Sequence, residues 1–191
     1  PLHCSAILDK GELVLVFGAS GAGKSTTMAA LLQKGYKPFS DDVCVPVFDA
    51  ESNELRLFSS YPMMKFWKET LDLTGYSLKV DRKIRPDIEK YGMYYHDDFM
   101  TASFKPKLII VLEKDDKFDT SVIDPIGGIK LFQLLEANAY RGEYLGFSDL
   151  KKEHFMIFTQ LANQSTCYLL KRPLTGNFVD EVAQKIINLL N

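Results

Sequence analysis

The stretch GASGAGKST, Gly18 to Thr26, matches the pattern G-x-x-x-x-G-K-[ST] at every position. It follows the apolar run ELVLVF, residues 12–17, and it leads into KSTTMAALLQK, residues 24–34, whose apolar residues fall on one helix face. A buried strand, a glycine-rich loop and a helix in this order are typical of a phosphate-binding loop. The stretch therefore predicts an α/β fold with a site for a nucleoside triphosphate.

The residue types in this phosphate loop suit the oxygens of a nucleotide. Gly18, Gly21 and Gly23 let backbone N–H groups point inward, where a side chain would block them. The start of the following helix adds attraction for an anion. Lys24 is expected on the outer phosphates and the Ser25 hydroxyl on a bound Mg²⁺. The predicted nucleotide-binding residues are Gly18, Ala19, Ser20, Gly21, Ala22, Gly23, Lys24, Ser25 and Thr26.

Length and composition restrict the class of protein. The chain has 191 residues, of which 46% are hydrophobic and 25% charged, and its formal net charge is −2. These values predict one domain over residues 1–191 and give no reason to expect a nucleic acid or a membrane as partner. Three scattered cysteines fit a reduced, cytoplasmic protein, and no apolar run resembles a membrane span or a signal peptide. The chain begins with Pro1 rather than Met, so we expect that it can be part of a longer protein.

The hydrophobic pattern predicts a mixed sheet flanked by helices. Strands are expected at 3–8 and 12–17, joined as a hairpin, and a second hairpin is expected around the turn at 49–53. Further strands are expected within 37–48 and at 54–58, 108–112, 120–123 and 167–170. Helices are expected at 24–34, 63–73, 131–140, 150–163 and 178–190, with a charged loop or short helix at 81–90.

Two adjacent aspartates and one histidine are candidates for the chemistry beside the loop. Asp41 and Asp42 begin 17 residues after Lys24, at the end of a strand that returns toward the loop. Neighbouring residues at a strand end point in different directions, so one carboxylate can hold Mg²⁺ while the other takes a proton from a hydroxyl. His3 comes beside the loop if the first hairpin pairs as predicted. Taken alone, these residues also fit a solvated turn and an ordinary strand start.

Other motifs are weaker or absent. The strand at 108–112 ends in Glu113, which imitates a Walker B carboxylate but lies far down the chain. His96, Asp97 and Asp98 form a polar cluster that lacks a third, separated metal ligand. No N-K-x-D guanine motif and no LSGGQ-like segment occurs in the chain, which argues against a GTPase and against a transporter ATPase.

Three segments together resemble a known family. LHCSAI (2–7), the phosphate loop and SDD (40–42) are similar to the catalytic domain of HPr kinase/phosphorylase and its serine-kinase relatives, which share a nucleotide site with phosphoenolpyruvate carboxykinases. The similarity is close over residues 3–45. YPMMKFW (61–67) and RKIRPDIEKY (82–91) look like the HPr-kinase-related branch rather than the regulatory enzyme. The resemblance implies an α/β kinase that uses ATP and Mg²⁺.

The resemblance also implies roles for individual residues. Lys24 would hold the β- and γ-phosphates of ATP, and Ser25 and Asp42 would serve the metal. Asp41 would be the general base toward the acceptor hydroxyl, and His3 would support the phosphate or the acceptor. Which aspartate takes which role stays open at this point.

The chain departs from the family farther downstream. The Glu-x-Arg-Gly motif of the regulatory enzyme is missing, because Leu57 follows Glu54-Leu55-Arg56. HPr as the substrate and a reverse, phosphorolytic reaction are therefore not carried over. Cations for the transferred phosphoryl group are expected elsewhere, since charge around its oxygens aids the transfer. The candidates are Lys65, Arg82, Arg85 and Arg141.

The sequence thus predicts transfer of the γ-phosphoryl group of ATP to a hydroxyl, with a serine as the preferred acceptor. The acceptor can belong to a protein, a peptide or a small molecule, and a homo-oligomer stays open. One alternative is a small-molecule kinase of the shikimate or nucleoside-monophosphate type, whose loop strand lies inside a parallel sheet. The other alternative is a non-catalytic ATP sensor, which binds the nucleotide without transferring a phosphoryl group.

Overall fold

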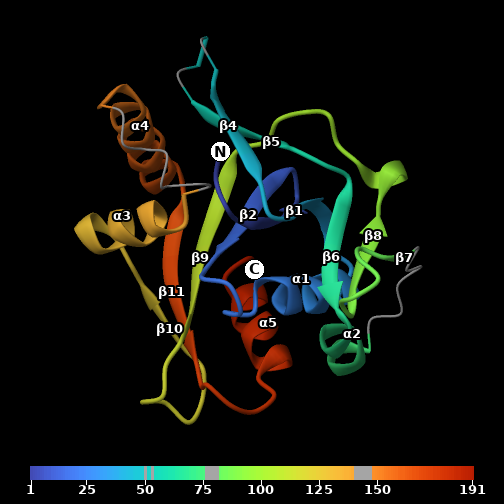
Figure 1. Cartoon of the computed structure of the whole chain (residues 1–191). Helices are drawn as coiled ribbons and strands as arrows, with labels where there is room; N and C mark the ends of the chain where they lie inside the picture. Colours follow the sequence, from blue (N-terminus) through green and yellow to red (C-terminus); the bar gives the residue numbers. More distant parts are fainter. Residues whose placement is uncertain (50, 53, 76–81, 140–147) are drawn as a thin grey trace.

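Six strands form the main sheet of the chain, in the order β10-β11-β9-β2-β1-β3, in this computed structural model (Figure 1). The strands β2, β9 and β11 are parallel, whereas the pairs β1–β2, β1–β3 and β10–β11 are antiparallel. The structure describes residues 1–49, 51–52, 54–75, 82–139 and 148–191. The strand bounds are β1 (Ser5–Asp9), β2 (Glu12–Phe17), β3 (Lys37–Ser40), β9 (Pro106–Lys114), β10 (Val122–Pro125) and β11 (Thr166–Arg172).

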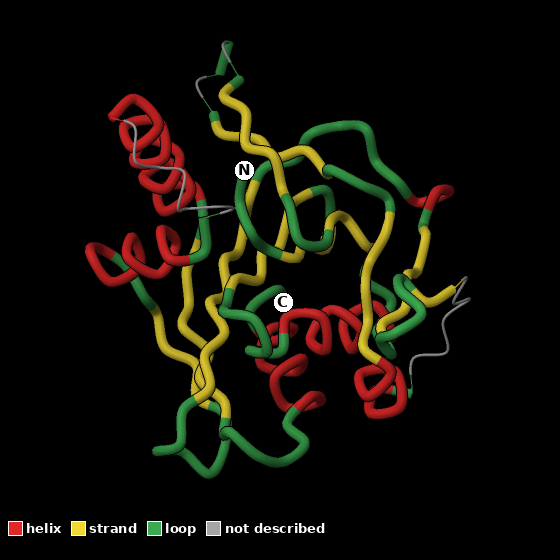
Figure 2. Tube along the Cα trace, viewed as in Figure 1, coloured by secondary structure: helices red, strands yellow, loops and turns green. Residues whose placement is uncertain are grey.

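Helices cover both faces of this sheet (Figure 2). Successive residues of a strand face opposite sides, so a strand that is apolar throughout needs cover on both. In β2, Val14 and Val16 join the core beneath α1 and α5, whereas Leu13 and Leu15 join the core beneath α3 and α4. The helix bounds are α1 (Lys24–Gln33), α3 (Gly128–Ala137), α4 (Ser148–Gln164) and α5 (Val179–Asn188).

Two smaller sheets complete the described part of the chain. One is the hairpin of β4 (Cys44–Phe48) and β5 (Leu55–Ser59). The other is antiparallel, in the order β6-β8-β7, and lies beside α1 (Figure 1). Buried Met64 and Phe66 of β6 pack in the same core as α1. The remaining bounds are β6 (Met63–Trp67), β7 (Arg82–Lys83), β8 (Lys90–Tyr94), α2 (Lys68–Thr74) and the 3-10 helix η1 (His96–Asp98).

The expected α/β class, with a mixed sheet flanked by helices, is confirmed, and so are both expected hairpins. The helix α3 begins three residues before the expected start at Leu131, because Gly128, Ile129 and Lys130 form its first turn. The expected end of that helix, Tyr140, lies outside the described residues. The short strand expected at 120–123 lies at β10, two residues farther along. No helix among the described residues is long and apolar enough to span a membrane.

The helix predicted at 63–73 is wrong over its first half. Residues of β6 alternate between the core and the outside, with Met64 and Phe66 buried and Lys65 and Trp67 on the other face. This period of two belongs to a strand, and it outweighs the helix propensity of methionine and lysine. The region predicted as a loop or short helix at 81–90 instead contains β7, and β8 begins at Lys90.

Candidate nucleotide-binding and phosphoryl-transfer site

The phosphate loop lies at the carboxyl edge of the parallel strands, where ligands bind in open α/β sheets. It leaves β2 at Gly18 and enters α1 at Lys24. The residue that caps α1 is Gly23, with φ of 113°, and no side chain caps the helix. The first amides of α1 therefore have no side-chain acceptor, which is the arrangement that an anionic ligand can complete.

Gly18 is the most tightly enclosed glycine of the loop. A Cβ atom at Gly18 would lie 2.6 Å from the carbonyl oxygen of Leu112 in β9, and the φ of Gly18 is 147°. Gly21 also has a positive φ, 78°, but a Cβ atom there would meet nothing within 4 Å. A side chain would strain the backbone at both positions, but of the two only a side chain at position 18 would also clash with a neighbouring atom.

The clash predicts that Gly18→Ala lowers the free energy of unfolding by about 1–3 kcal/mol more than Gly21→Ala does. Urea denaturation of the two variants and of the unmodified chain measures this difference. Gly21→Ala is the matched control, since it introduces the same methyl group into the same loop at a positive φ. Equal losses for the two variants would contradict the close approach of β9 to Gly18.

Lys24 lies folded over the loop, with its side chain largely buried. Its Nζ donates to the carbonyl oxygens of Gly18 at 2.6 Å and Ala19 at 3.4 Å. Burial lowers the pKa of the Lys24 ammonium, while the charges of Asp42 and Asp41 act in the opposite direction. The ammonium is therefore close to both the loop and the aspartate pair.

Asp41 is the buried member of the pair, with 7% of its surface exposed. Its Oδ1 accepts from the Ser5 hydroxyl at 2.8 Å, and its Oδ2 accepts from the Lys65 backbone N–H at 2.9 Å. Burial and the neighbouring Asp42 charge raise the pKa of Asp41 above its ordinary value. Each carboxylate oxygen has a second lone pair, so both bonds leave capacity for a proton.

Asp42 is the more accessible member and differs in its electrostatics. Its Oδ2 accepts from the Lys65 Nζ in an ion pair. Burial raises the pKa of Asp42, but the hydrogen bond and charge of Lys65, together with Lys90 and His3, bring the pKa below its ordinary value. The backbone of Asp42 has a φ of 66°, in the left-handed region. Asp42 therefore stays ionised at a point where the chain turns sharply.

His3 lies near enough to Lys24 and the aspartate pair for their charges to act on its imidazole. Burial and the nearby Lys24 ammonium lower the pKa of His3, so its imidazole is neutral at neutral pH. The backbone N–H of His3 donates to the backbone carbonyl of Asn138 at 3.1 Å. The side chain of Asn138, at the end of α3, accepts from the Gly18 N–H at 3.2 Å. Asn138 thus joins the loop to His3, two residues before β1, and sequence reasoning missed it because no motif marks it.

Two further cations lie at the site without having been predicted. The Arg172 Nε donates to the Ala22 carbonyl at 2.9 Å, on the flank of the loop at Gly23. Arg172 ends the parallel strand β11, and the position of a strand end at this edge could have indicated it. Lys90 begins β8, and its charge lowers the pKa of both Lys24 and Asp42. The tyrosines Tyr91 and Tyr94 favour a strand at these residues and could have indicated it.

Of the cations predicted for the transferred phosphoryl group, the structure brings only Lys65 to the aspartate pair among those whose side chains it describes. Arg85 is instead exposed and paired with Asp87, two residues along the same turn. The backbone of Arg82 pairs with Gly92 in β7–β8. Arg141 lies outside the described residues.

The weaker motifs occupy different places. His96, Asp97 and Asp98 form the exposed η1. Glu113, near the end of β9, lines a cavity of about 400 Å³ beside the loop. No group of three or more His, Cys, Asp or Glu residues in the described ranges is arranged to hold a metal ion.

The oxygen donors of the site fit a Mg²⁺ ion that takes further ligands from a bound anion and water. Mg²⁺ prefers oxygen ligands and is held by one or two protein groups together with phosphate oxygens and water. Asp42 supplies an ionised, half-exposed carboxylate, and the half-buried Ser25 supplies a hydroxyl in the first turn of α1. A metal held only by protein side chains would need more ligands than these two residues offer.

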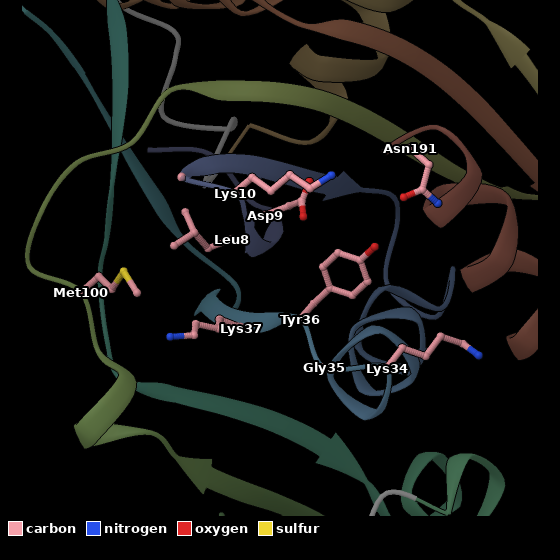
Figure 3. A pocket seen from close by; sticks show the side chains of 10 residues that line it. Leu8, Asp9, Lys10, Lys34, Gly35, Tyr36, Lys37, Met100 and Asn191 are labelled. Atoms are coloured by element: carbon pink, nitrogen blue, oxygen red, sulfur yellow. The ribbon is translucent and has the colours of Figure 1, made fainter.

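Cavities lie near both ends of β2, one beside the glycine-rich loop and one at the β1–β2 turn. A cavity of about 130 Å³ adjoins the loop on the side of Thr26, Arg172 and Phe178. The larger cavity of Figure 3, about 470 Å³, lies at the β1–β2 turn, where Asp9, Lys10 and Tyr36 line it. That turn is at the opposite end of β2 from the glycine-rich loop, so cavity size does not distinguish the candidate site.

Comparisons with known proteins give a limited result. No model of a protein family matches the chain, and no curated protein matches it either. Among solved structures, the chain is similar to the Hpr(Ser) kinase/phosphatase from Coxiella burnetii, with 14% identity and a TM-score of 0.48. The match covers 98% of this chain and 94% of that chain. A likeness at this level carries no conclusion about activity, so the function has to follow from the residues of this chain.

Proposed function

We propose that the chain is a kinase that transfers the γ-phosphoryl group of ATP to a hydroxyl, with a serine as the preferred acceptor. The observation that carries this proposal is the position of Asp41 and Asp42 within electrostatic reach of Lys24 at the phosphate loop. One carboxylate has a raised pKa and its neighbour a lowered one. Titratable neighbours whose pKa values are pushed apart are typical of an acid–base pair with divided roles.

Asp41 is the proposed general base. The acceptor oxygen attacks the γ-phosphorus, its proton passes to a carboxylate oxygen of Asp41, and the bond from the γ-phosphorus to the β,γ-bridging oxygen breaks to release ADP. Ser5 and the Lys65 N–H fix the Asp41 carboxylate, so it needs little reorganisation during the transfer. Its raised pKa favours proton acceptance.

Asp42 and Ser25 are the proposed metal ligands, and Lys24 with the loop amides holds the phosphates. Mg²⁺, when bound, neutralises charge on the β- and γ-phosphate oxygens. Asp42 suits this role because it stays ionised and is accessible. His3 is neutral, so it can orient the acceptor or a phosphate by hydrogen bonding without adding a charge.

The order of strands bears on the first alternative. In the shikimate and nucleoside-monophosphate type, the loop strand lies between parallel neighbours. Here β2 has a parallel neighbour, β9, on one side and its antiparallel hairpin partner, β1, on the other. This arrangement favours a kinase of the HPr-kinase-like class over the shikimate or nucleoside-monophosphate type. The sensor alternative is separated from the proposal only by a test of phosphoryl transfer.

The decisive experiment is ³¹P NMR of the chain with Mg²⁺ and ATP, first alone and then with free serine, serine-containing peptides or an HPr protein. We expect a new phosphomonoester signal with one of these acceptors, and its loss in Asp41→Asn. ATP that binds without transfer to any of them would contradict the kinase proposal and favour the sensor. A chain that binds no ATP would contradict both.

A further inference from the structure

The sheet of β6, β8 and β7 presents one face to the candidate site. Its other face is buried, with Met64 and Phe66 in the core against α1. The open face carries Lys65, whose ammonium reaches Asp42, and the cross-strand pair Trp67 and Lys90. Cross-strand partners lie on the same face of a sheet. Lys90 is therefore on the face that turns toward the aspartates.

Lys90 is held at this position by the only tryptophan of the chain. Its Nζ lies 5.3 Å from the centroid of the Trp67 ring, a cation–π arrangement. Trp67 is 48% exposed, so its ring is open to solvent beside the Lys90 ammonium. Within the described part of the chain, Lys90 makes no ion pair with a carboxylate. Trp67 therefore holds the Lys90 ammonium in position, and no described carboxylate forms an ion pair with it.

The other cations of the site are already engaged. Lys65 pairs with Asp42, and Arg172 donates to the carbonyl oxygens of Ala22 and Pro173. Lys24 belongs to the phosphate loop itself. Lys90 is close enough to influence the charged state of both Lys24 and Asp42. Lys24 and Lys90 repel each other, Asp42 already offsets part of this repulsion, and a bound anion near both ammonium groups would offset more of it.

We propose that Lys90 binds an oxygen of the γ-phosphoryl group of ATP and acts with Lys24 as the second cation of the transfer. The inference rests on the proposed function, because it places ATP in the phosphate loop. The anion near both ammonium groups is then the group being transferred. Trp67 keeps Lys90 in place when the nucleotide is absent, which lowers the entropy lost on binding. Lys90 thereby fills the role that the sequence assigned to Lys65 and the arginines.

Calorimetric titration with Mg²⁺·ADP and with the non-hydrolysable Mg²⁺·β,γ-imido-ATP tests the proposal. We expect the unmodified chain to prefer the triphosphate, and Lys90→Met to lose about tenfold or more of that preference, as for a hydrogen bond between charged groups. The affinity for ADP should stay unchanged. Lys90→Arg should keep most of the preference, because it retains both the charge and the contact with Trp67. Trp67 emission should respond more to the triphosphate than to ADP.

Lys83→Met is the matched control. Lys83 belongs to the same sheet and lies over the Tyr91 ring at 6.0 Å, but it pairs with Glu89 rather than facing the site. It should keep the full preference for the triphosphate. A Lys90→Met variant with the same preference as the unmodified chain would overturn the role of Lys90 while leaving the proposed function intact. Failure of the unmodified chain to bind either nucleotide would overturn the proposed function, and this inference with it.

Discussion

Replacing Asp41 with asparagine is expected to lower kcat by about a hundredfold to ten-thousandfold, as for the loss of an aligned general base. The amide can keep both existing hydrogen bonds, because its oxygen can accept from the Lys65 N–H and its NH₂ can donate to Ser5. The geometry of the site is therefore preserved while the proton acceptor is removed. Initial rates of ADP release with the acceptor found by NMR measure the effect.

The pH dependence provides a second readout for Asp41. A base must be deprotonated to act, so kcat should fall as the pH is lowered through the pKa of the aspartate pair. That acid limb should lie above the pKa of an ordinary aspartate, because burial and Asp42 raise the pKa of Asp41. In Asp41→Asn the limb should move to lower pH. Asp98→Asn, in the exposed η1, is the control and should keep the native rate and limb. Near-native turnover of Asp41→Asn would remove the base assignment.

Replacing Lys24 with methionine is expected to lower kcat by about a hundredfold to a thousandfold, because a preorganised cation on the transferred group is lost. Methionine is an unbranched side chain that can fill much of the space of the lysine stem. The amide donors of the loop remain, so weakened ATP binding should accompany the slower transfer rather than complete loss of binding. Steady-state kinetics and a binding titration separate the two effects.

A control for Lys24→Met is available at the far end of the main sheet. Lys37 is exposed at the start of β3 and lines the distant cavity of Figure 3. Lys37→Met removes the same charge from the chain without touching the loop, and it should keep the native rate. If Lys24→Met were equally active, the loop could not be holding the phosphates that react.

The sequence was sufficient for the parts of the site that a contiguous motif defines. The order of strand, loop and helix predicted β2 and α1 and the glycine-rich turn between them, because glycine spacing and apolar pattern are local properties. The expected hairpin of the first two strands is formed by β1 and β2. Pairing of the first two strands was readable because a short turn joins them.

The residues that were missed come from distant segments. Asn138, Arg172 and Lys90 reach the site from α3, β11 and β8, and each contacts or influences it only through tertiary packing. A lone lysine or asparagine at the end of an element has no local signature. The misassigned stretch at 63–73 has a related cause, since Met64 and Phe66 alternate with Lys65 and Trp67 over too few residues to outweigh propensity.

The aspartate pair is shared between two separately hydrogen-bonded sheets. Ser5 belongs to β1 of the main sheet, and Lys65 belongs to β6 of the three-stranded sheet. No named strand of one sheet pairs with a named strand of the other in the described part of the chain. No backbone hydrogen bonds between named strands fix the distance between the two sheets in the described part of the chain. This distance therefore depends on the volume of the side chains packed between β6 and α1, chiefly Met64 and Phe66. The alignment of the proposed catalytic pair thus depends on the interior of the chain, where a change of a single methylene group could shift it.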